Sequence, residues 1–128
     1  MTTADILLHM SGFELHYDRN AVINSGRLER MASHLLHQKN MYPLYPAHQD
    51  ICIDYVLLEQ HGILNAKPHI LILPSTMKTF VKDIDDCLII NPEKLTKGFN
   101  GGTFARIEIA PGSNKSICDR ASVQILRV

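Results

Sequence analysis

Two apolar runs in the second half of the chain limit its fold more than any other feature. The first, Ile70–Leu73, lies between Pro68 and Pro74, and the second, Cys87–Ile90, is closed by Asn91-Pro92. Both runs have strand length and neither alternates between apolar and polar residues, which is typical of strands covered on both faces. Covered strands need further layers of structure, so the sequence predicts a mixed α/β protein.

Helical spacing of apolar residues is found around these runs. Helices are expected from Thr3 to Met10 and, with the strongest pattern, from Ser25 to Gln38. A short extended or turn segment at Ile51–Tyr55 is followed by a short helix or irregular piece to Gly62. Ser75 is a possible cap for one more short helix. The apolar face of that helix would hold Met77, Phe80, Val81 and Ile84.

The last third of the chain has the pattern of paired strands. Thr103–Ile109 alternates between apolar and polar residues, and Ala121–Val128 is a second strand after the loop Pro111–Asn114. An antiparallel hairpin with a long connection is therefore predicted. The glycines within Lys97–Thr103 lead into a strand, whereas phosphate-binding loops lead into a helix. We expect them to allow a tight turn with positive φ, and we reject a nucleotide loop.

Composition narrows the possible functions. Of 128 residues, 45% are hydrophobic, which is enough to form the core of one ordinary domain. Basic and acidic residues both number 13, and this zero net charge disfavours autonomous nucleic-acid binding while leaving a local basic patch open. Cys52, Cys87 and Cys118 form no C-x-x-C pair, which fits a reducing intracellular compartment. The apolar runs are too short to span a membrane, so a soluble chain is expected.

Two clusters of side chains invite a metal or catalytic hypothesis. His34 and His37 lie three residues apart on the polar side of a predicted helix, without an evident third ligand. Asp83, Asp85 and Asp86 form an acidic cluster before the second apolar run, without a basic or glycine-rich phosphate clamp. A solvated surface is the favoured interpretation of the histidines, and a polar helix-to-strand turn that of the aspartates.

Five blocks of sequence follow one another between Pro68 and Arg106. They are Pro68–Ser75, Phe80–Lys82, Cys87–Pro92, Leu95–Gly98 and Gly101–Arg106. Their residues and their order resemble the accessory B subunits of the B-family DNA polymerases. Tyr42–Pro46 resembles the alpha-polymerase branch of that family in particular, and Thr3–Leu7 resembles the beginning of the same region.

Two short segments depart from the family pattern. Glu93 stands where the family has glycine in an Asn-Pro-Gly-Arg sequence, and Phe99-Asn100 replaces a more usual Gln-Val. The first departure brings a β-carbon and a negative charge to a turn. It therefore bears on the geometry of that turn and on any basic contact surface beside it.

The resemblance implies a fold and an activity. The fold is the C-terminal portion of a calcineurin-like phosphoesterase, a two-sheet sandwich flanked by helices, with an OB fold alongside. Residues 1–128 would be a single segment of that domain, without its N-terminal half and without the OB fold. A late G-H-x-H metal motif is not found in the sequence, so an inactive domain without a cofactor is expected. A residual metal-dependent phosphoesterase and a remnant that no longer assembles are the alternatives.

The resemblance also implies partners. The family scaffolds the DNA polymerase alpha–primase complex in the nucleus by holding the C-terminal domain of the catalytic subunit, with primase and DNA reached through the complex and no membrane involved. Tyr42 and Tyr45 are candidate anchors, because aromatic residues are enriched at interface centres. Packing of the proline turn within the protein is the other explanation for them. Lys94, Lys97 and Arg106 are candidate contacts to an acidic partner or to DNA, against a solvated surface.

Overall fold

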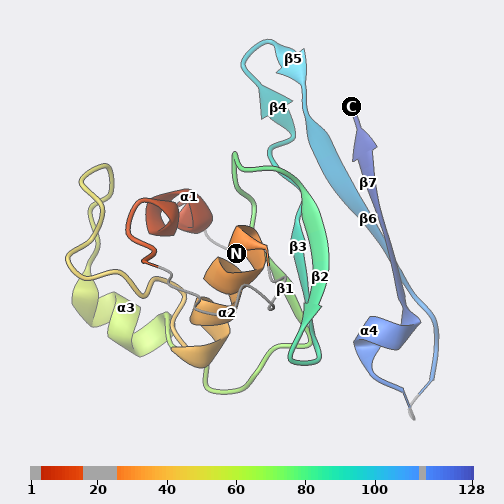
Figure 1. Cartoon of the computed structure of the whole chain (residues 1–128), viewed down its shortest axis with the longest axis horizontal. Coiled ribbons are helices and arrows are strands. Elements are labelled where there is room, and N and C mark those ends of the chain that lie inside the picture. Colours follow the sequence, from red (N-terminus) through yellow and green to blue (C-terminus); the bar gives the residue numbers. More distant parts are fainter. Residues whose placement is uncertain (1–3, 16–25, 113–114) are drawn as a thin grey trace. The chain divides into compact units, whose positions relative to one another are not determined.

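A computed structural model of the chain describes residues 4–15, 26–112 and 115–128. The chain forms two compact units: one is Ile6–Lys67, and the other is Pro68–Val128 together with the residues up to Asp5. Figure 1 shows helices and short sheets distributed along the chain, so the prediction of a mixed α/β protein is confirmed. Within the described ranges no helix is both long and apolar enough to cross a bilayer.

The unit Ile6–Lys67 is built on two helices that pack against each other, α1 (Ile6–Ser11) and α2 (Arg27–His37). Both predicted helices are confirmed, although the residues suggested as their first residues, Thr3 and Ser25, lie outside the described part of the chain. The apolar stripe of α2 is buried as expected. The two helices together bury Ile6, Leu7, Met10, Met31, Ala32, Leu35 and Leu36.

A third helix, α3 (Tyr55–His61), completes this unit and confirms the short helix expected before Gly62. Asp54 caps it, because its carboxylate accepts hydrogen bonds from the N–H groups of Val56 and Leu57 at 3.0 and 3.1 Å. The chain after α3 pairs with the chain after α2: Met41 N–H donates to the Gly62 carbonyl at 2.8 Å. These backbone bonds fix α3 although none of its residues is buried.

The second unit contains a three-stranded sheet with the order β1-β3-β2. β1 (Ile70–Ile72) runs parallel to β3 (Cys87–Asn91), and β2 (Phe80–Ile84) runs antiparallel to it. All five residues of β3 are buried, which confirms that this strand is covered on both faces. The same prediction is wrong for part of β1, since Leu71 is buried whereas Ile72 is 41% exposed.

The helix predicted after Ser75 is wrong, because Phe80–Ile84 forms the strand β2. Met77, Phe80, Val81 and Ile84 repeat at helical spacing, but pairing of Phe80–Ile84 along the whole of β3 favours the strand. The Ser75 hydroxyl does accept a hydrogen bond from Met77 N–H at 3.1 Å, but no helix follows. The acidic turn therefore joins two strands rather than a helix and a strand. Asp85 and Asp86 have φ of 52° and 58°, as a two-residue hairpin turn of the primed type requires.

The last third forms two antiparallel pairs. β4 (Thr96–Lys97) pairs with β5 (Asn100–Gly101), and β6 (Thr103–Ile109) pairs along its whole length with β7 (Ala121–Arg127). The predicted hairpin is confirmed, and its long connection contains the short helix α4 (Ile117–Arg120). Figure 1 shows β6 and β7 as a long ribbon, coloured blue.

Candidate partner-binding surfaces

The loop that contains both candidate tyrosines, residues 42–50, is held from inside the first unit. Tyr42 is only 5% exposed, and its hydroxyl accepts a hydrogen bond from His48 N–H at 3.1 Å. The same hydroxyl lies 3.1 Å from His9 Nδ1 on α1. The imidazole rings of His9 and His48 are stacked, with centroids 4.4 Å apart. Tyr42 thus fixes the loop to α1, as expected for a tyrosine that packs within the protein.

Tyr45 lies on the same loop but is exposed. Its side chain is 86% exposed, and it precedes the cis peptide bond to Pro46. The Tyr55 ring, at the beginning of α3, lies edge to face against it, with centroids 5.6 Å apart. The Tyr55 hydroxyl accepts a hydrogen bond from Ala47 N–H at 3.1 Å. The structure therefore presents Tyr45 on a loop that two tyrosine hydroxyls hold in place.

Beyond Tyr45, the first residues of α3 are exposed and apolar. Tyr55, Val56 and Leu57 have exposed fractions of 44, 64 and 52%. Their exposure was not predicted from the sequence. A signal was available, because four consecutive apolar residues on a short helix point in directions about 100° apart and cannot all face one core.

An open cavity of about 190 Å³ lies in the same unit, among the end of α1, the polar side of α2 and the proline turn. Phe13, His34 and Leu44 are among the residues that line it. The Glu14 carboxylate at its wall is 6% exposed and bridges Arg27 and Arg30 at 3.3 and 3.1 Å, so its charge is compensated. The cavity is small beside ligand pockets of about 300–1,000 Å³.

The histidines of α2 occupy a solvated surface, which confirms the favoured interpretation of their sequence pattern. His34 and His37 are both exposed, and His37 Nδ1 lies 3.3 Å from the hydroxyl of Ser33. Across the described ranges no group of three or more His, Cys, Asp or Glu side chains is arranged to hold a metal ion.

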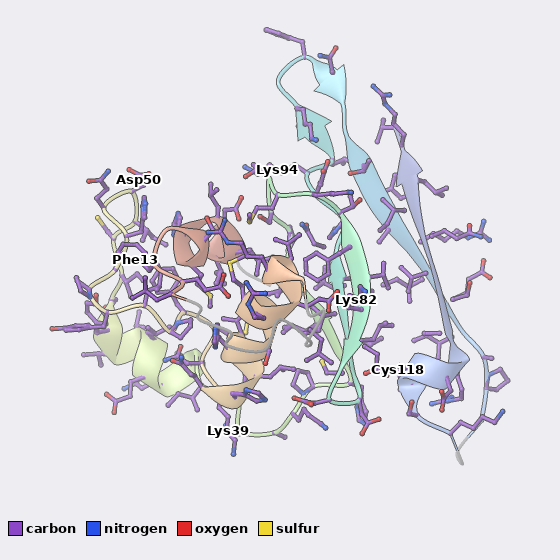
Figure 2. The ribbon with its side chains drawn as sticks, viewed as in Figure 1. Phe13, Lys39, Asp50, Lys82, Lys94 and Cys118 are labelled. Carbon is purple, nitrogen blue, oxygen red and sulfur yellow. The ribbon has the colours of Figure 1, made fainter. Side chains whose placement is uncertain are left out.

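Strand β2, which leads into the turn at Asp85 and Asp86, contacts helix α4. Helix α4 also packs against β3. Asp83 on β2 accepts a hydrogen bond from the Cys118 thiol, and Figure 2 labels Cys118 on α4. Burial, followed by the Asp83 carboxylate, raises the pKa of this thiol above its usual value. The pair is thus suited to holding a neutral thiol, since a nucleophilic cysteine requires a lowered pKa.

The three candidate basic residues lie in the second unit, and two of them are ion-paired. Lys97 Nζ lies 2.5 Å from Glu93 Oε2, and the guanidinium of Arg106 contacts the Glu108 carboxylate. Lys94 has an exposed side chain in the turn between β3 and β4, where Figure 2 labels it. Each pair neutralises a positive charge that a phosphate would otherwise attract. A basic patch made by these residues is weaker than their number suggests.

The turn after β3 is organised by Asn91, which is fully buried. Its Oδ1 accepts hydrogen bonds from Ser75 N–H at 3.1 Å and from Glu93 N–H at 2.9 Å. Its Nδ2 donates to the carbonyls of Met77 at 3.0 Å and Lys78 at 3.1 Å. This Asn91 network joins the segment before β2 to the turn after β3. From the sequence, the residue could be recognised only as the end of a strand.

Glu93 adopts the left-handed conformation that the family's glycine would favour, with φ of 62°. A proline followed by a residue with positive φ is the arrangement that type II turns use, with glycine preferred at the second position. The turn therefore has the conformation that glycine would favour. Because Glu93 has a β-carbon, its backbone is strained in this conformation.

Replacing Glu93 with glycine is expected to stabilise the second unit by about 1 kcal/mol. The strain energy that is removed with the left-handed conformation is larger than the stabilisation that is lost with the Lys97 ion pair. A partly exposed pair of this kind contributes at most about 1 kcal/mol. The free energy of unfolding, measured by urea denaturation, checks the result. Glu93→Gln is the control, since it removes the charge and keeps the strain, and it should be neutral or slightly destabilising. A Glu93→Gly variant less stable than Glu93→Gln would refute the strain argument.

Comparisons with known proteins define the class of the chain. The profile of the family of DNA polymerase alpha/epsilon B subunits matches residues 1–82. The chain therefore belongs to this family of polymerase B subunits. This confirms the resemblance drawn from the blocks between Pro68 and Arg106 and from Tyr42–Pro46.

Individual relatives belong to the alpha branch of that family. The chain is 40% identical over 107 residues to the B subunit of DNA polymerase alpha from Mus musculus, which is 84% of this chain and 17% of the relative. It is 43% identical over 117 residues to that of Schizosaccharomyces pombe, covering 87% and 20%. It is 35% identical over 133 residues to that of Drosophila melanogaster, covering 100% and 21%. The chain thus spans about a fifth of the length of the relatives it matches.

Proposed function

We propose that the chain is part of a non-catalytic scaffold subunit of the DNA polymerase alpha–primase complex, and that it binds the C-terminal domain of the catalytic subunit. The observation that carries this proposal is the similarity of nearly the whole chain to B subunits of DNA polymerase alpha in animals and in Schizosaccharomyces pombe. Nuclear localisation and indirect contact with primase follow from the same proposal.

The proposed contact surface contains the residues singled out in the sequence, with unequal roles. Tyr45 is the exposed anchor of the first unit, and Tyr42 positions the loop that carries it. Lys94, Lys97 and Arg106 are proposed contacts of the second unit. Because Lys97 and Arg106 are ion-paired, we expect them to contact a protein partner rather than DNA. The chain would reach DNA only through the complex.

The proposed fold is the C-terminal portion of a calcineurin-like phosphoesterase sandwich in which catalysis has been lost. The fully buried strand β3, with a parallel and an antiparallel neighbour, supports a sheet from the interior of a layered domain.

A binding assay with the C-terminal domain of the polymerase alpha catalytic subunit tests the function. The chain should be retained on the immobilised domain, and Tyr45→Ala should weaken the affinity about tenfold, as loss of an exposed aromatic anchor does. Ile109→Ala is the matched control, because it truncates an exposed apolar side chain at the end of β6 that lies away from Lys94 and Lys97. Absence of retention would refute the scaffold proposal. Metal-dependent phosphodiesterase turnover by the full-length protein would instead support the residual enzyme.

A further inference from the structure

We propose that Glu93 is a specificity residue that keeps nucleic-acid phosphates away from Lys94 and Lys97 and so reserves this turn for a protein partner. The inference deepens the proposed function and rests on it for the assignment of the two lysines to a contact surface. We define the Glu93 turn as residues 92–97, which follow β3 and include β4.

The side chain of Glu93 is present at a cost to stability. Its backbone has φ of 62°, a conformation that glycine adopts without strain and that strains a residue with a β-carbon. The ion pair with Lys97 offsets little of this strain, because the lysine side chain is 53% exposed. A residue held in a strained conformation is a candidate for a functional role. The part of the residue that glycine would lack is the carboxylate, so the role belongs to this group.

The Glu93 carboxylate lies among basic residues that the fold brings together. Its Oε2 is 2.5 Å from Lys97 Nζ, and Lys94 follows it in the same turn with an exposed side chain (Figure 2). A third basic residue is supplied by β7, because Arg127 pairs with Thr103 and Thr103 N–H donates to the Lys94 carbonyl at 3.0 Å. Glu93 is the one acidic residue in the sequence of the Glu93 turn. It therefore supplies the negative charge of an otherwise basic turn.

The backbone that carries this negative charge is held in place. Glu93 N–H donates to Asn91 Oδ1 at 2.9 Å, and the Thr103 hydroxyl donates to the Pro92 carbonyl at 2.6 Å. The Glu93 side chain is itself only 14% exposed. An approaching phosphate thus meets a carboxylate whose supporting backbone cannot move aside without breaking these hydrogen bonds.

This arrangement favours protein over nucleic acid as the partner of the turn. Nucleic acids bind when lysine and arginine replace the counterions of several phosphates. Lys97 is already paired with Glu93, and the carboxylate repels any phosphate that approaches Lys94. A protein surface carries groups of both signs and can pair with Glu93 and Lys94 together. A repulsive group of this kind discriminates between partners without adding affinity for the correct one.

Fluorescence anisotropy with a labelled duplex DNA oligonucleotide tests the inference. At low salt, Glu93→Gln should bind the duplex about fivefold more tightly than the unchanged chain, because it removes the repulsive charge and releases Lys97. The slope of log affinity against log salt concentration should become steeper by about one, which is the contribution of one additional lysine–phosphate contact. A change in folding alone would not produce this change in slope.

Variants of matched charge separate the position of Glu93 from net charge. Glu59→Gln changes the net charge by the same amount at an exposed residue of α3, and it should leave the salt slope unchanged. The double variant Glu93→Gln/Lys97→Gln should lose the gain in affinity. Glu93→Gln/Lys115→Gln has the same net charge as that double variant and should keep the gain, since Lys115 is exposed outside the Glu93 turn. Circular dichroism establishes that each variant is folded.

The outcomes separate this inference from the proposed function. Equal gains for Glu93→Gln and Glu59→Gln, a gain that survives loss of Lys97, or no binding of the duplex by Glu93→Gln would each refute the specificity role of Glu93. None of these results would affect retention of the chain on the catalytic subunit's C-terminal domain, which tests the scaffold proposal. A gain specific to Glu93→Gln without that retention would support the exclusion of phosphates by Glu93 and refute the scaffold proposal alone.

Discussion

Replacing Asn91 with alanine is expected to lower the free energy of unfolding of the second unit by about 4 kcal/mol. The side chain is fully buried and makes four hydrogen bonds, all to the backbone. Truncation leaves two N–H groups and two carbonyls without this partner, and the bond to Ser75 N–H is buried while the other three are partly buried. Each such group costs about 1 kcal/mol or more when it is left unpaired. Urea denaturation, combined with hydrogen exchange of the amides of β3, measures the loss in this unit.

Thr103→Val is the matched comparison for this prediction. The Thr103 hydroxyl donates one hydrogen bond, to the Pro92 carbonyl at 2.6 Å, in the same turn region. Its replacement removes a single bond and keeps the shape of the side chain, so a loss of about 1 kcal/mol is expected. If Asn91→Ala costs no more than Thr103→Val, the Asn91 network does not organise the turn. Asn91→Asp should also be strongly destabilising, because a carboxylate cannot donate to the carbonyls of Met77 and Lys78.

The elements that could be predicted from sequence are those whose pattern is complete within a few residues. β3 lacks alternation because both faces are buried, and Thr103–Ile109 alternates because its two faces differ. The stripe of α2 repeats at helical spacing along the helix. β2 could not be assigned in this way. Its apolar residues repeat at helical spacing and do not alternate, and the strand forms because it pairs with β3, which lies after it in the chain.

The candidate surfaces were predicted less well, because exposure depends on distant residues. Tyr42 and Tyr45 belong to the same short motif, yet one is buried and the other is exposed. The burial of Tyr42 is associated with its contact to His9, 33 residues away in sequence. Likewise, Asn91 was visible as part of a motif, but its bonds reach residues 13 to 16 positions earlier. Such relations are fixed by the folded chain and have no local periodicity.

Replacing Gly102 with alanine is expected to lower the free energy of unfolding of the second unit by about 3 kcal/mol. A β-carbon at Gly102 would lie 1.9 Å from the Lys94 carbonyl oxygen and 2.9 Å from the carbonyl carbon of Leu95. Both neighbours are backbone atoms and cannot turn aside. Their segment is also bonded to the strand, since Gly102 N–H donates to the Leu95 carbonyl at 2.8 Å and Thr103 N–H to that of Lys94 at 3.0 Å. Relief of the clash therefore breaks these bonds.

Gly98→Ala distinguishes two reasons for glycine in this segment. One is a close contact with neighbouring backbone atoms, and the other is a left-handed backbone conformation. Gly98 has φ of 61°, and a β-carbon there would have no atom within 4 Å, so alanine meets open space and costs only about 1 kcal/mol for its left-handed conformation. Positive φ was the expected reason for all these glycines, and the geometry supports that reason at Gly98 alone. Thermal or urea unfolding of the two variants gives the comparison. A loss at Gly102 no larger than that at Gly98 would refute the close contact with Lys94 as the reason for glycine at position 102.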